Sequence, residues 1–378
     1  MHNRTWVEIS RTALEANVRT LQAQLGADTT FSACVKGNAY GHDIALTTKA
    51  LLEIGVTHFT VDSIDEAFVV RKLSHDAVIF IVGMTPIERF REAITAQFVL
   101  DIYDEDALNA AIADAVSLQK VALVNVEIET GLHRLGAMPR VLLDLARLIK
   151  NNPRNVKLVG LSTHLSSAEN PQARHVVDEQ LASLDHARAD FAAYDIVAPY
   201  VHSANSAATI LHPTTHETMV RAGIAVYGLW PSQEMRIAVQ RGKAFELRPV
   251  LAWKCLVAQV KDVPSGGAVG YDRTYVTNRP MRVAVLPVGY YDGYDRKLSS
   301  KGKVLLRGRL CPVVGRVCMN MIMVDVSDIP QVKAGDVAVL IGREGMSSIT
   351  ADELADAIGT IHYEVVTRIN PNIARIVV

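Results

Sequence analysis

Between residues 31 and 221 of the 378-residue chain, eight short β-type runs alternate with stretches that show the apolar spacing of helices. In chain order the runs read FSACV, HFTVD, VIFIV, FVLDI, VALVNVEIE, KLVGLSTH, PYVHS and MVRAG. Segments such as PRVLLDLARLIK lie between them. Regular alternation of this kind predicts parallel βα units, and eight units predict a closed (β/α)8 barrel of the TIM type. We therefore expect an α/β fold with this barrel in its N-terminal part.

The segment SRTALEANVRTLQAQLG, residues 10–26, precedes the first β-type run. Ser10 has the character of a helix N-cap and Gly26 that of a helix stop. The apolar residues at helical intervals between them are Leu14, Val18, Leu21 and Leu25. The segment therefore predicts an amphipathic helix.

After about residue 240 the chain changes to β-rich runs separated by Gly, Pro and Asp turns, as in KVLLRGRLCPVVGRVCMNMIMVDV. This pattern predicts a second, mostly antiparallel β domain. One helix is indicated near the end by TADELADAIG, where Thr350 and Glu353 have capping-box spacing. We expect a barrel domain over residues 1–240 and a β-rich domain over residues 241–378, with the first residues able to pair with the second domain.

Composition limits the partners of such a chain. Lys and Arg total 39 against 40 Asp and Glu, so there is no basic excess for nucleic acid. No apolar run approaches the ~20 residues of a membrane helix, and the N-terminus lacks a secretory signal. The four cysteines are scattered and form no CxxC pair, which favours reduced thiols over a disulfide scaffold or a metal site. We expect a cytoplasmic protein that acts on a small molecule.

Barrel enzymes carry their chemistry at the carboxyl ends of the strands, so the polar residues after each run are the candidates. Lys36 follows the first run, Arg134 the fifth and His164 closes the sixth. Phosphate in such barrels is often bound after strands 7 and 8, where HSANSAAT offers the Ser206 hydroxyl and VRAGIAVYG allows close backbone approach at Gly223. A lysine across that mouth could bind the aldehyde of pyridoxal 5'-phosphate (PLP).

Taken singly, these signals are weak. A lysine after a strand is usually a solvated charge, a single histidine is more often scaffolding than a catalyst, and GNAYG could be a turn. Taken together they are specific, because the chain resembles the alanine racemases over essentially its full length. The segments that carry the resemblance are VKGNAYGHD, ETGLHRLG, STHLSSAE, HSANSAA, VRAGIAVYGLWPS, VGYDRTY, PVGYYDGYDR, VGRVCMN and GTIHYEVV.

The resemblance implies two bases, as a racemase needs one on each face of the substrate Cα. Lys36 would hold PLP and serve one face, and Tyr271 would serve the other. The implied cofactor-binding residues are Lys36, Tyr40, His164, Asn205, Ser206, Arg221, Gly223, Ile224 and Tyr363. Arg134 and the backbone N–H of Met319 would hold the substrate carboxylate, and Arg296, Arg316 and Tyr290 would line the entrance.

Within this family Arg221 would face the pyridine nitrogen of PLP, where related barrel decarboxylases have a glutamate, and His164 would form a hydrogen bond near Tyr271. The family also implies a head-to-tail homodimer in which Tyr271 serves the partner's barrel. The expected activity is the interconversion of L-alanine and D-alanine, which supplies D-alanine for cell-wall peptidoglycan. No metal is expected.

Two positions depart from the family pattern. Glu127 stands where many members have a carbamylated lysine, seven residues before Arg134, and Asn320 stands where an aspartate usually follows the methionine. Strand alternation places Asn125, Glu127 and Glu129 on the inward face of their run. We expect Glu127 to act as a permanent anion oriented towards Arg134, without a need for carbon dioxide.

Three alternatives stay open at this point. A serine or broader amino-acid racemase would use the same catalytic groups, and Asn320 weakens the argument for strict alanine preference. A non-catalytic PLP carrier would need the barrel, Lys36 and the phosphate site but neither Tyr271 nor a second domain. A decarboxylase is the third reading, and Arg221 in VRAGI argues against it.

Overall fold

The structure is a computed structural model that describes residues 3–242 and 245–378. The chain divides into two compact units. The barrel unit comprises Leu14–Ala39 and Ile44–Arg248, and the β-rich unit comprises the chain up to Ala13, Tyr40–Asp43 and Pro249–Val378.

An eight-stranded parallel sheet in the order β8-β7-β6-β5-β4-β3-β2-β9 forms the barrel unit. Its strands are β2 Thr30–Cys34, β3 His58–Val61, β4 Val78–Ile81, β5 Val99–Ile102, β6 Ala122–Glu127, β7 Val156–Ser162, β8 Tyr200–His202 and β9 Met219–Ala222. Backbone bonds from Thr218 N to Val201 O (3.3 Å) and from Arg221 N to Ala204 O (2.8 Å) join the β8 and β9 edges. The predicted N-terminal barrel is confirmed.

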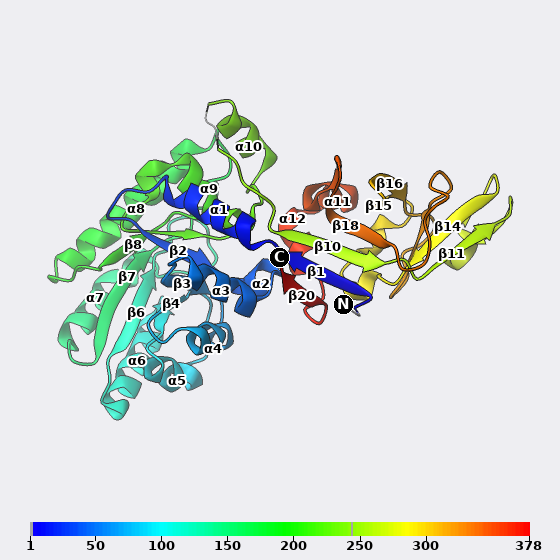
Figure 1. Ribbon diagram of the computed structural model, residues 1–378. Coiled ribbons are helices and arrows are strands. Elements are labelled where there is room, and N and C mark those ends of the chain that lie inside the picture. The colour runs from blue at the N-terminus through cyan, green and yellow to red at the C-terminus, as the bar shows by residue number, and fades with distance from the viewer. Residues whose placement is uncertain (1–2, 243–244) are drawn as a thin grey trace. The chain divides into compact units, whose positions relative to one another are not determined.

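Helices surround this sheet (Figure 1). They are α1 Arg11–Gln22, α2 Lys36–Tyr40, α3 Ile44–Glu53, α4 Ile64–Leu73, α5 Phe90–Thr95, α6 Glu105–Leu118, α7 Leu142–Asn151, α8 Arg174–Ala192, α9 Ser206–Leu211 and α10 Gln233–Gln240. Short 3-10 turns are η1 Ile87–Arg89, η2 Pro139–Val141, η3 Pro213–Thr215 and η4 Ile224–Tyr227. Each parallel crossover therefore places the carboxyl ends of the strands at one rim of the barrel.

Helix α1 begins as the sequence predicts and ends earlier. Ser10 Oγ accepts a hydrogen bond from Ala13 N (3.3 Å), which caps the first turn. Leu14, Val18 and Leu21 are buried. Beyond Ala23 the backbone hydrogen bonds span three residues, as from Leu25 N to Gln22 O. The predicted helical stretch up to Gly26 therefore ends in a turn and not in α-helix.

The β-rich unit contains a larger sheet in the order β16-β15-β18-β10-β1-β20, a sheet β11-β14-β17 and a hairpin β12-β13, with β19 paired to β18. The strands are β1 Thr5–Ile9, β10 Leu251–Leu256, β11 Gln259–Val263, β12 Ala268–Val269, β13 Tyr275–Val276, β14 Met281–Leu286, β15 Lys303–Leu306, β16 Arg309–Pro312, β17 Ile322–Asp325, β18 Val337–Glu344, β19 Ser347–Ile349 and β20 Ala374–Val377. Strand β1 is antiparallel to β10 and parallel to β20. The other pairs are antiparallel, as predicted.

Two helices, α11 Ala351–Ile358 and α12 His362–Thr367, and the turns η5 Tyr271–Arg273, η6 Tyr290–Asp292 and η7 Arg296–Leu298 complete this unit. Helix α11 has the predicted capping box, because Thr350 Oγ1 accepts from Glu353 N and the Glu353 carboxylate accepts from Thr350 N. The buried Arg375 donates hydrogen bonds to the carbonyl oxygens of Gly41, Asn370, Ile373 and Ile369. Arg375 thereby fixes the chain next to Tyr40.

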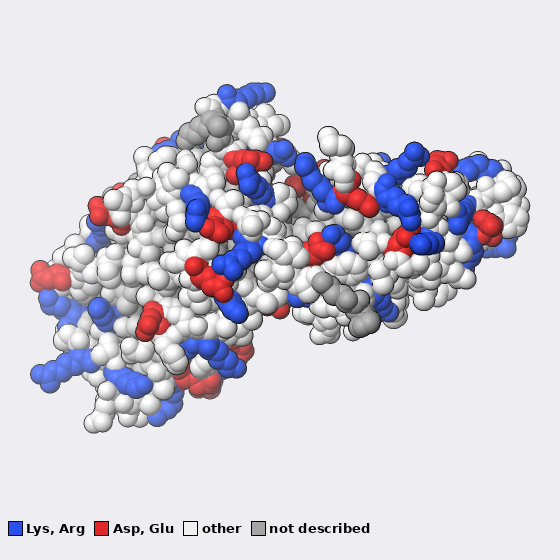
Figure 2. Space-filling view, in the orientation of Figure 1, with Lys and Arg blue, Asp and Glu red and all other residues white. Residues whose placement is uncertain are grey.

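Across the part of the chain that the structure describes, no helix is both long and apolar enough to cross a membrane. On the face of the barrel unit drawn in Figure 2, basic and acidic side chains are interspersed. That face therefore presents no broad field of one sign, in line with the near-zero net charge of the sequence.

Candidate active site

Five of the predicted residues lie at the carboxyl rim of the barrel unit. Lys36 follows β2, Arg134 lies in the loop after β6, His164 follows β7, Ser206 begins the helix after β8, and Arg221 lies in β9. The positive charges of Arg221, Arg134 and Lys36, together with burial as the largest cause, lower the pKa of His164 to about 3. His164 is therefore a neutral residue surrounded by cations.

Lys36 begins a turn of unusual handedness. Gly37, Asn38, Ala39 and Tyr40 all have positive φ, between 52° and 62°. Such a left-handed turn costs roughly 1–2 kcal/mol for each residue with a side chain. Glu66 supports it by accepting from Asn38 N (3.1 Å) and Asp62 N (3.0 Å). The turn sends the Lys36 side chain out from the strand end, where Nζ lies 3.4 Å from Asp62 Oδ1.

Arg221 is buried at the rim, and hydrogen bonds to neighbouring residues fix its guanidinium group. It donates to Thr163 O (2.9 Å) and His202 O (2.6 Å), and also to Nδ1 of His202. Burial lowers the pKa of Arg221, and burial followed by the charge of Arg221 lowers that of His202. A neutral His202 that accepts at Nδ1 carries its proton on Nε2, which fits the contact of Nε2 with Asn125 Oδ1 (3.1 Å).

A polar layer continues inward from His202. Asn125 Nδ2 donates to Asp101 Oδ1 (2.8 Å) and to Ser162 Oγ (2.8 Å). Gly160 leaves room for this layer, since a Cβ at that position would lie 2.3 Å from Asn125 Oδ1. Asp101 also interacts with the carboxyl group of Glu127, two residues beyond Asn125 on the same face of β6. Glu127 therefore contacts Asp101. The expected orientation of Glu127 towards Arg134 stays a prediction.

The loops after β8 and β9 bring a hydroxyl and backbone N–H groups together. Ser206 Oγ accepts from Gly223 N (2.8 Å) and from Ala225 N (3.3 Å). Asn205 caps α9 by accepting from Ala208 N (3.0 Å), and Ile224 begins the next turn. A hydroxyl with converging N–H groups suits a phosphate oxygen. An amine, an arginine and this arrangement at one rim therefore form a donor set that fits PLP.

The carboxylate of Glu129 fixes the loop that carries Arg134. Glu129 accepts backbone hydrogen bonds from His133, Gly131 and Arg134. Burial alone would raise the pKa of Glu129, but these N–H groups lower it overall. A charged Glu129 therefore fixes the loop from which Arg134 projects.

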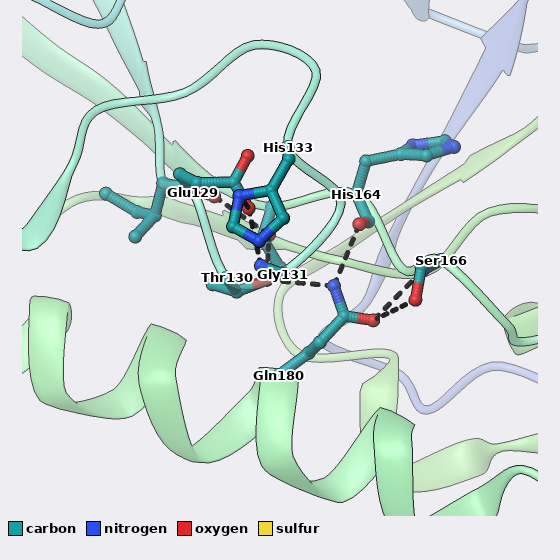
Figure 3. Close-up of polar contacts among 9 residues, drawn as sticks. Glu129, Thr130, Gly131, His133, His164, Ser166 and Gln180 are labelled. Atoms are coloured by element: carbon teal, nitrogen blue, oxygen red, sulfur yellow. Dashed lines mark hydrogen bonds and ion pairs between the residues drawn. The ribbon is translucent and has the colours of Figure 1, made fainter.

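Sequence reasoning missed Gln180, a residue of α8 with 2% of its surface exposed. Its amide donates to Thr130 Oγ1 (3.0 Å) and His164 O (3.1 Å), and its oxygen accepts from Ser166 N (2.9 Å) and Ser166 Oγ (3.2 Å) (Figure 3). One side chain thus joins the loops after β6 and β7. The available signal was a glutamine within the otherwise apolar stripe Val177, Leu184, Ala187 and Phe191.

The remaining predicted residues belong to the β-rich unit. Tyr271 lies in η5 with 68% of its surface exposed, next to Asp272, which pairs with Arg316 (2.9 Å). Met319 is exposed, and Tyr291 N donates to its carbonyl oxygen (3.0 Å). The rings of Tyr40 and Tyr363 lie 6.2 Å apart. The positions predicted at the entrance lie in η6 (Tyr290), η7 (Arg296) and the loop before Met319 (Arg316).

Comparison with known proteins gives a consistent result. The family models for the alanine racemase N-terminal and C-terminal domains match residues 9–231 and 250–377. An alanine racemase of Leptospira interrogans is 35% identical over 378 residues, covering 99% of this chain and 96% of that protein. The crystal structure of alanine racemase from a D-cycloserine producing Streptomyces lavendulae has a TM-score of 0.93 at 32% identity, covering 100% of this chain and 98% of that one.

A further solved structure belongs to a racemase that is named for a different amino acid. The histidine racemase of Leuconostoc mesenteroides has a TM-score of 0.90 at 26% identity and covers 100% of this chain and 98% of its own. The same architecture therefore occurs in a racemase named for another amino acid.

Proposed function

The chain belongs to the alanine racemase family and interconverts L- and D-alanine, and on that premise we propose that Lys36 and Tyr271 are its two bases and PLP its cofactor. The observation that carries this proposal is the donor set at one rim of the barrel unit: the Lys36 amine, the buried Arg221, and Ser206 with the N–H groups of Gly223 and Ala225. The second family domain supplies Tyr271 and argues against a non-catalytic PLP carrier.

Each residue has a defined task in this proposal. PLP, when bound through Lys36, supplies an electron sink that acidifies the Cα–H bond of the amino acid. Lys36 moves the proton on one face of Cα, and Tyr271 moves it on the other. Arg221 would donate a hydrogen bond to the pyridine nitrogen, and the phosphate would be held by Ser206, Tyr40, Tyr363, Asn205 and the backbone from Gly223 to Ile224. Arg134 and the Met319 N–H bind the substrate carboxylate.

His164 contributes as a neutral hydrogen-bonding group, because its lowered pKa keeps it unprotonated at neutral pH. The buried Arg221 stays a poor proton donor to the ring nitrogen compared with a carboxylic acid, which favours reversible proton transfer at Cα over decarboxylation. These properties support the proposed role of the barrel-unit residues in racemisation.

We also propose that the protein acts as a head-to-tail homodimer, with Tyr271 at the partner's Lys36. The support is the strong exposure of Tyr271 together with other apolar side chains of the β-rich unit, namely Tyr290, Tyr291, Met319, Met321 and Ile361. A cytoplasmic location and a supply of D-alanine for peptidoglycan belong to the same proposal. The reduced state of Cys34, Cys255, Cys311 and Cys318 suits a reducing compartment.

Borohydride reduction of the holoenzyme followed by peptide mapping tests the cofactor assignment. The expected result is a stable pyridoxyl label on Lys36 and none in Lys36→Ala. A label on another lysine, or no label after reconstitution with PLP, would overturn it.

A racemase of wider scope is the second candidate, favoured by Asn320 and by the histidine racemase that shares the fold. Incubation with single L-amino acids, followed by loss of optical rotation, separates the two. Alanine turned over well above serine and histidine supports strict specificity, and comparable rates support the wider enzyme.

A further inference from the structure

Beneath the candidate active site, one chain of contacts runs from Arg221 to a pair of buried acids. Arg221 contacts His202, His202 contacts Asn125, and Asn125 Nδ2 donates to Asp101 Oδ1. Asp101 and Asn125 are direct partners across β5 and β6, so their side chains leave the same face of the sheet. Glu127 follows two residues later on that face. The two carboxyl groups therefore lie side by side in the barrel interior.

One carboxyl oxygen of this pair accepts no hydrogen bond from the residues that the structure describes. Asp101 Oδ2 is buried and has no donor among the described residues, while the Glu127 carboxyl group lies within hydrogen-bonding reach of Asp101. Two ionised carboxylates have acceptors and no donor to share, so their close contact requires a proton between them. Burial, and then the negative charge of Glu127, raise the pKa of Asp101 well above its ordinary value.

The charged and titratable groups around the pair come from five other strands or loops. Arg221 of β9 is the cation that acts on Asp101, and it also feels the charge of Glu127. His202 of β8 is neutral, and Tyr103 follows β5. Arg134 and Cys34 act on Arg221 from further along the rim. Arg221 is thus a buried cation, and the acid pair lies in its field.

We propose that Asp101 and Glu127 share one proton and act as a counterion of single negative charge to Arg221, positioning it through Asn125 and His202. The consequence for Arg221 rests on the proposed function, but the shared proton does not. One charge keeps Arg221 protonated without giving it a direct carboxylate partner, so the N–H groups that do not bond His202 and Thr163 are left for the cofactor. Glu127 thus contributes a charge that needs no carbon dioxide.

Proton counting tests the pair directly. At about pH 6 an unfolded chain ionises both carboxyls, so unfolding must release the shared proton. Guanidinium unfolding of the holoenzyme in weak buffer with a pH indicator should release one proton more per chain from the wild type than from Asp101→Asn. Glu127→Gln should show the same deficit and serves if the first variant does not fold. The exposed Asp106→Asn is the control and should match the wild type. Equal release by wild type and both variants would overturn the pair.

The role of the acid pair is tested by comparing kcat/KM among variants that keep one negative charge or none. Each single variant keeps one negative charge, on Glu127 or on Asp101, whereas Asp101→Asn with Glu127→Gln keeps none. Leaving Arg221 buried without a counterion should lower kcat/KM by on the order of a hundredfold. Each single variant should lose far less kcat/KM than the double variant, because it keeps one negative charge. Losses that multiply in the double variant would overturn the single-charge assignment.

The proton count and the labelling of Lys36 test different claims, so either one can fail without the other. The proton count needs no substrate and no bond at Lys36, so its failure removes the acid pair and leaves the cofactor assignment standing. Failure to label Lys36 would remove the cofactor assignment and leave the acid pair standing.

Discussion

The side-chain amide of Gln180 donates a hydrogen bond to the backbone carbonyl oxygen of His164 at 3.1 Å, and the same amide nitrogen donates to Thr130 Oγ1 at 3.0 Å (Figure 3). Thr130 and Arg134 belong to one loop and His164 to another. A helix residue therefore sets the distance between the proposed carboxylate-binding loop and the neutral histidine.

Gln180→Glu should weaken substrate binding as well as the fold. The carboxylate can still accept from Ser166 but cannot donate to Thr130 or His164, and two lost buried hydrogen bonds cost about 1–3 kcal/mol each. We expect KM for alanine to rise at least tenfold with a smaller change in kcat. Steady-state kinetics in both directions, with the thermal midpoint as a check, measure this. An unchanged KM would show that Gln180 serves the fold alone.

Tyr271→Phe should abolish most racemisation while PLP stays bound. The phenol is assigned to proton transfer and not to cofactor binding, and loss of a general base costs roughly 10²–10⁴ in rate. Racemase activity and the absorbance of bound cofactor are the two measurements. The neighbouring Tyr275→Phe is the matched control. Near wild-type turnover by the Tyr271→Phe enzyme would contradict the two-base assignment.

A mixture of Lys36→Ala and Tyr271→Phe should be more active than either protein separately. In a head-to-tail dimer, a mixed pair regains one site with both bases. Subunit exchange, followed through tags of two kinds, must be demonstrated first. Exchange without recovered activity would place both bases within one chain.

Gly160→Ala should destabilise the barrel. Its Cβ would lie 2.3 Å from Asn125 Oδ1 and 3.0 Å from His202 Nε2, and both atoms are held by hydrogen bonds. Forcing a methyl group into a packed interior costs typically ~1–3 kcal/mol. Gly26→Ala, whose Cβ would meet its nearest atom at 3.9 Å, is the control. Equal thermal midpoints for the two variants would refute the steric argument.

His164→Gln should reduce the loss of stability in acid. The pKa of His164 in the folded protein is about 3, below its ordinary value of 6.5. Between these two pH values His164 is protonated in the unfolded chain but stays neutral in the folded chain. The wild type therefore loses stability from this group as pH falls from 6.5 towards 3, and the variant does not. Thermal midpoints at about pH 8 and about pH 5 test this, with the exposed His186→Gln as control. A midpoint difference that does not change with pH would contradict it.

Much of the fold could be predicted because its signals are local. Eight β-type runs with helical spacers fix the barrel, and the Thr350 capping box marks α11 before any packing is known. The positions of Lys36, Arg134 and His164 at strand ends could be predicted because the carboxyl ends of the barrel strands share one rim.

The polar layer could not be predicted in the same way. The pairing of Asp101 with Asn125 depends on the β5–β6 register, and β6 has a bulge against β7 at Val124/Asn125. Gln180 contacts Thr130, fifty residues away in sequence. Such partners follow from tertiary structure, and a single sequence carries no local trace of them.

The turn after Lys36 has a stereochemical consequence. Ala39 is buried with φ 55° and ψ 49°, the mirror image of the ordinary helical conformation of an L-residue. D-alanine adopts that conformation without strain. Beside its proposed catalytic lysine, a racemase that makes D-alanine thus holds one of its own L-alanines in the backbone geometry of its product, and a semisynthetic chain with D-alanine at this position would relieve the strain that the natural chain bears.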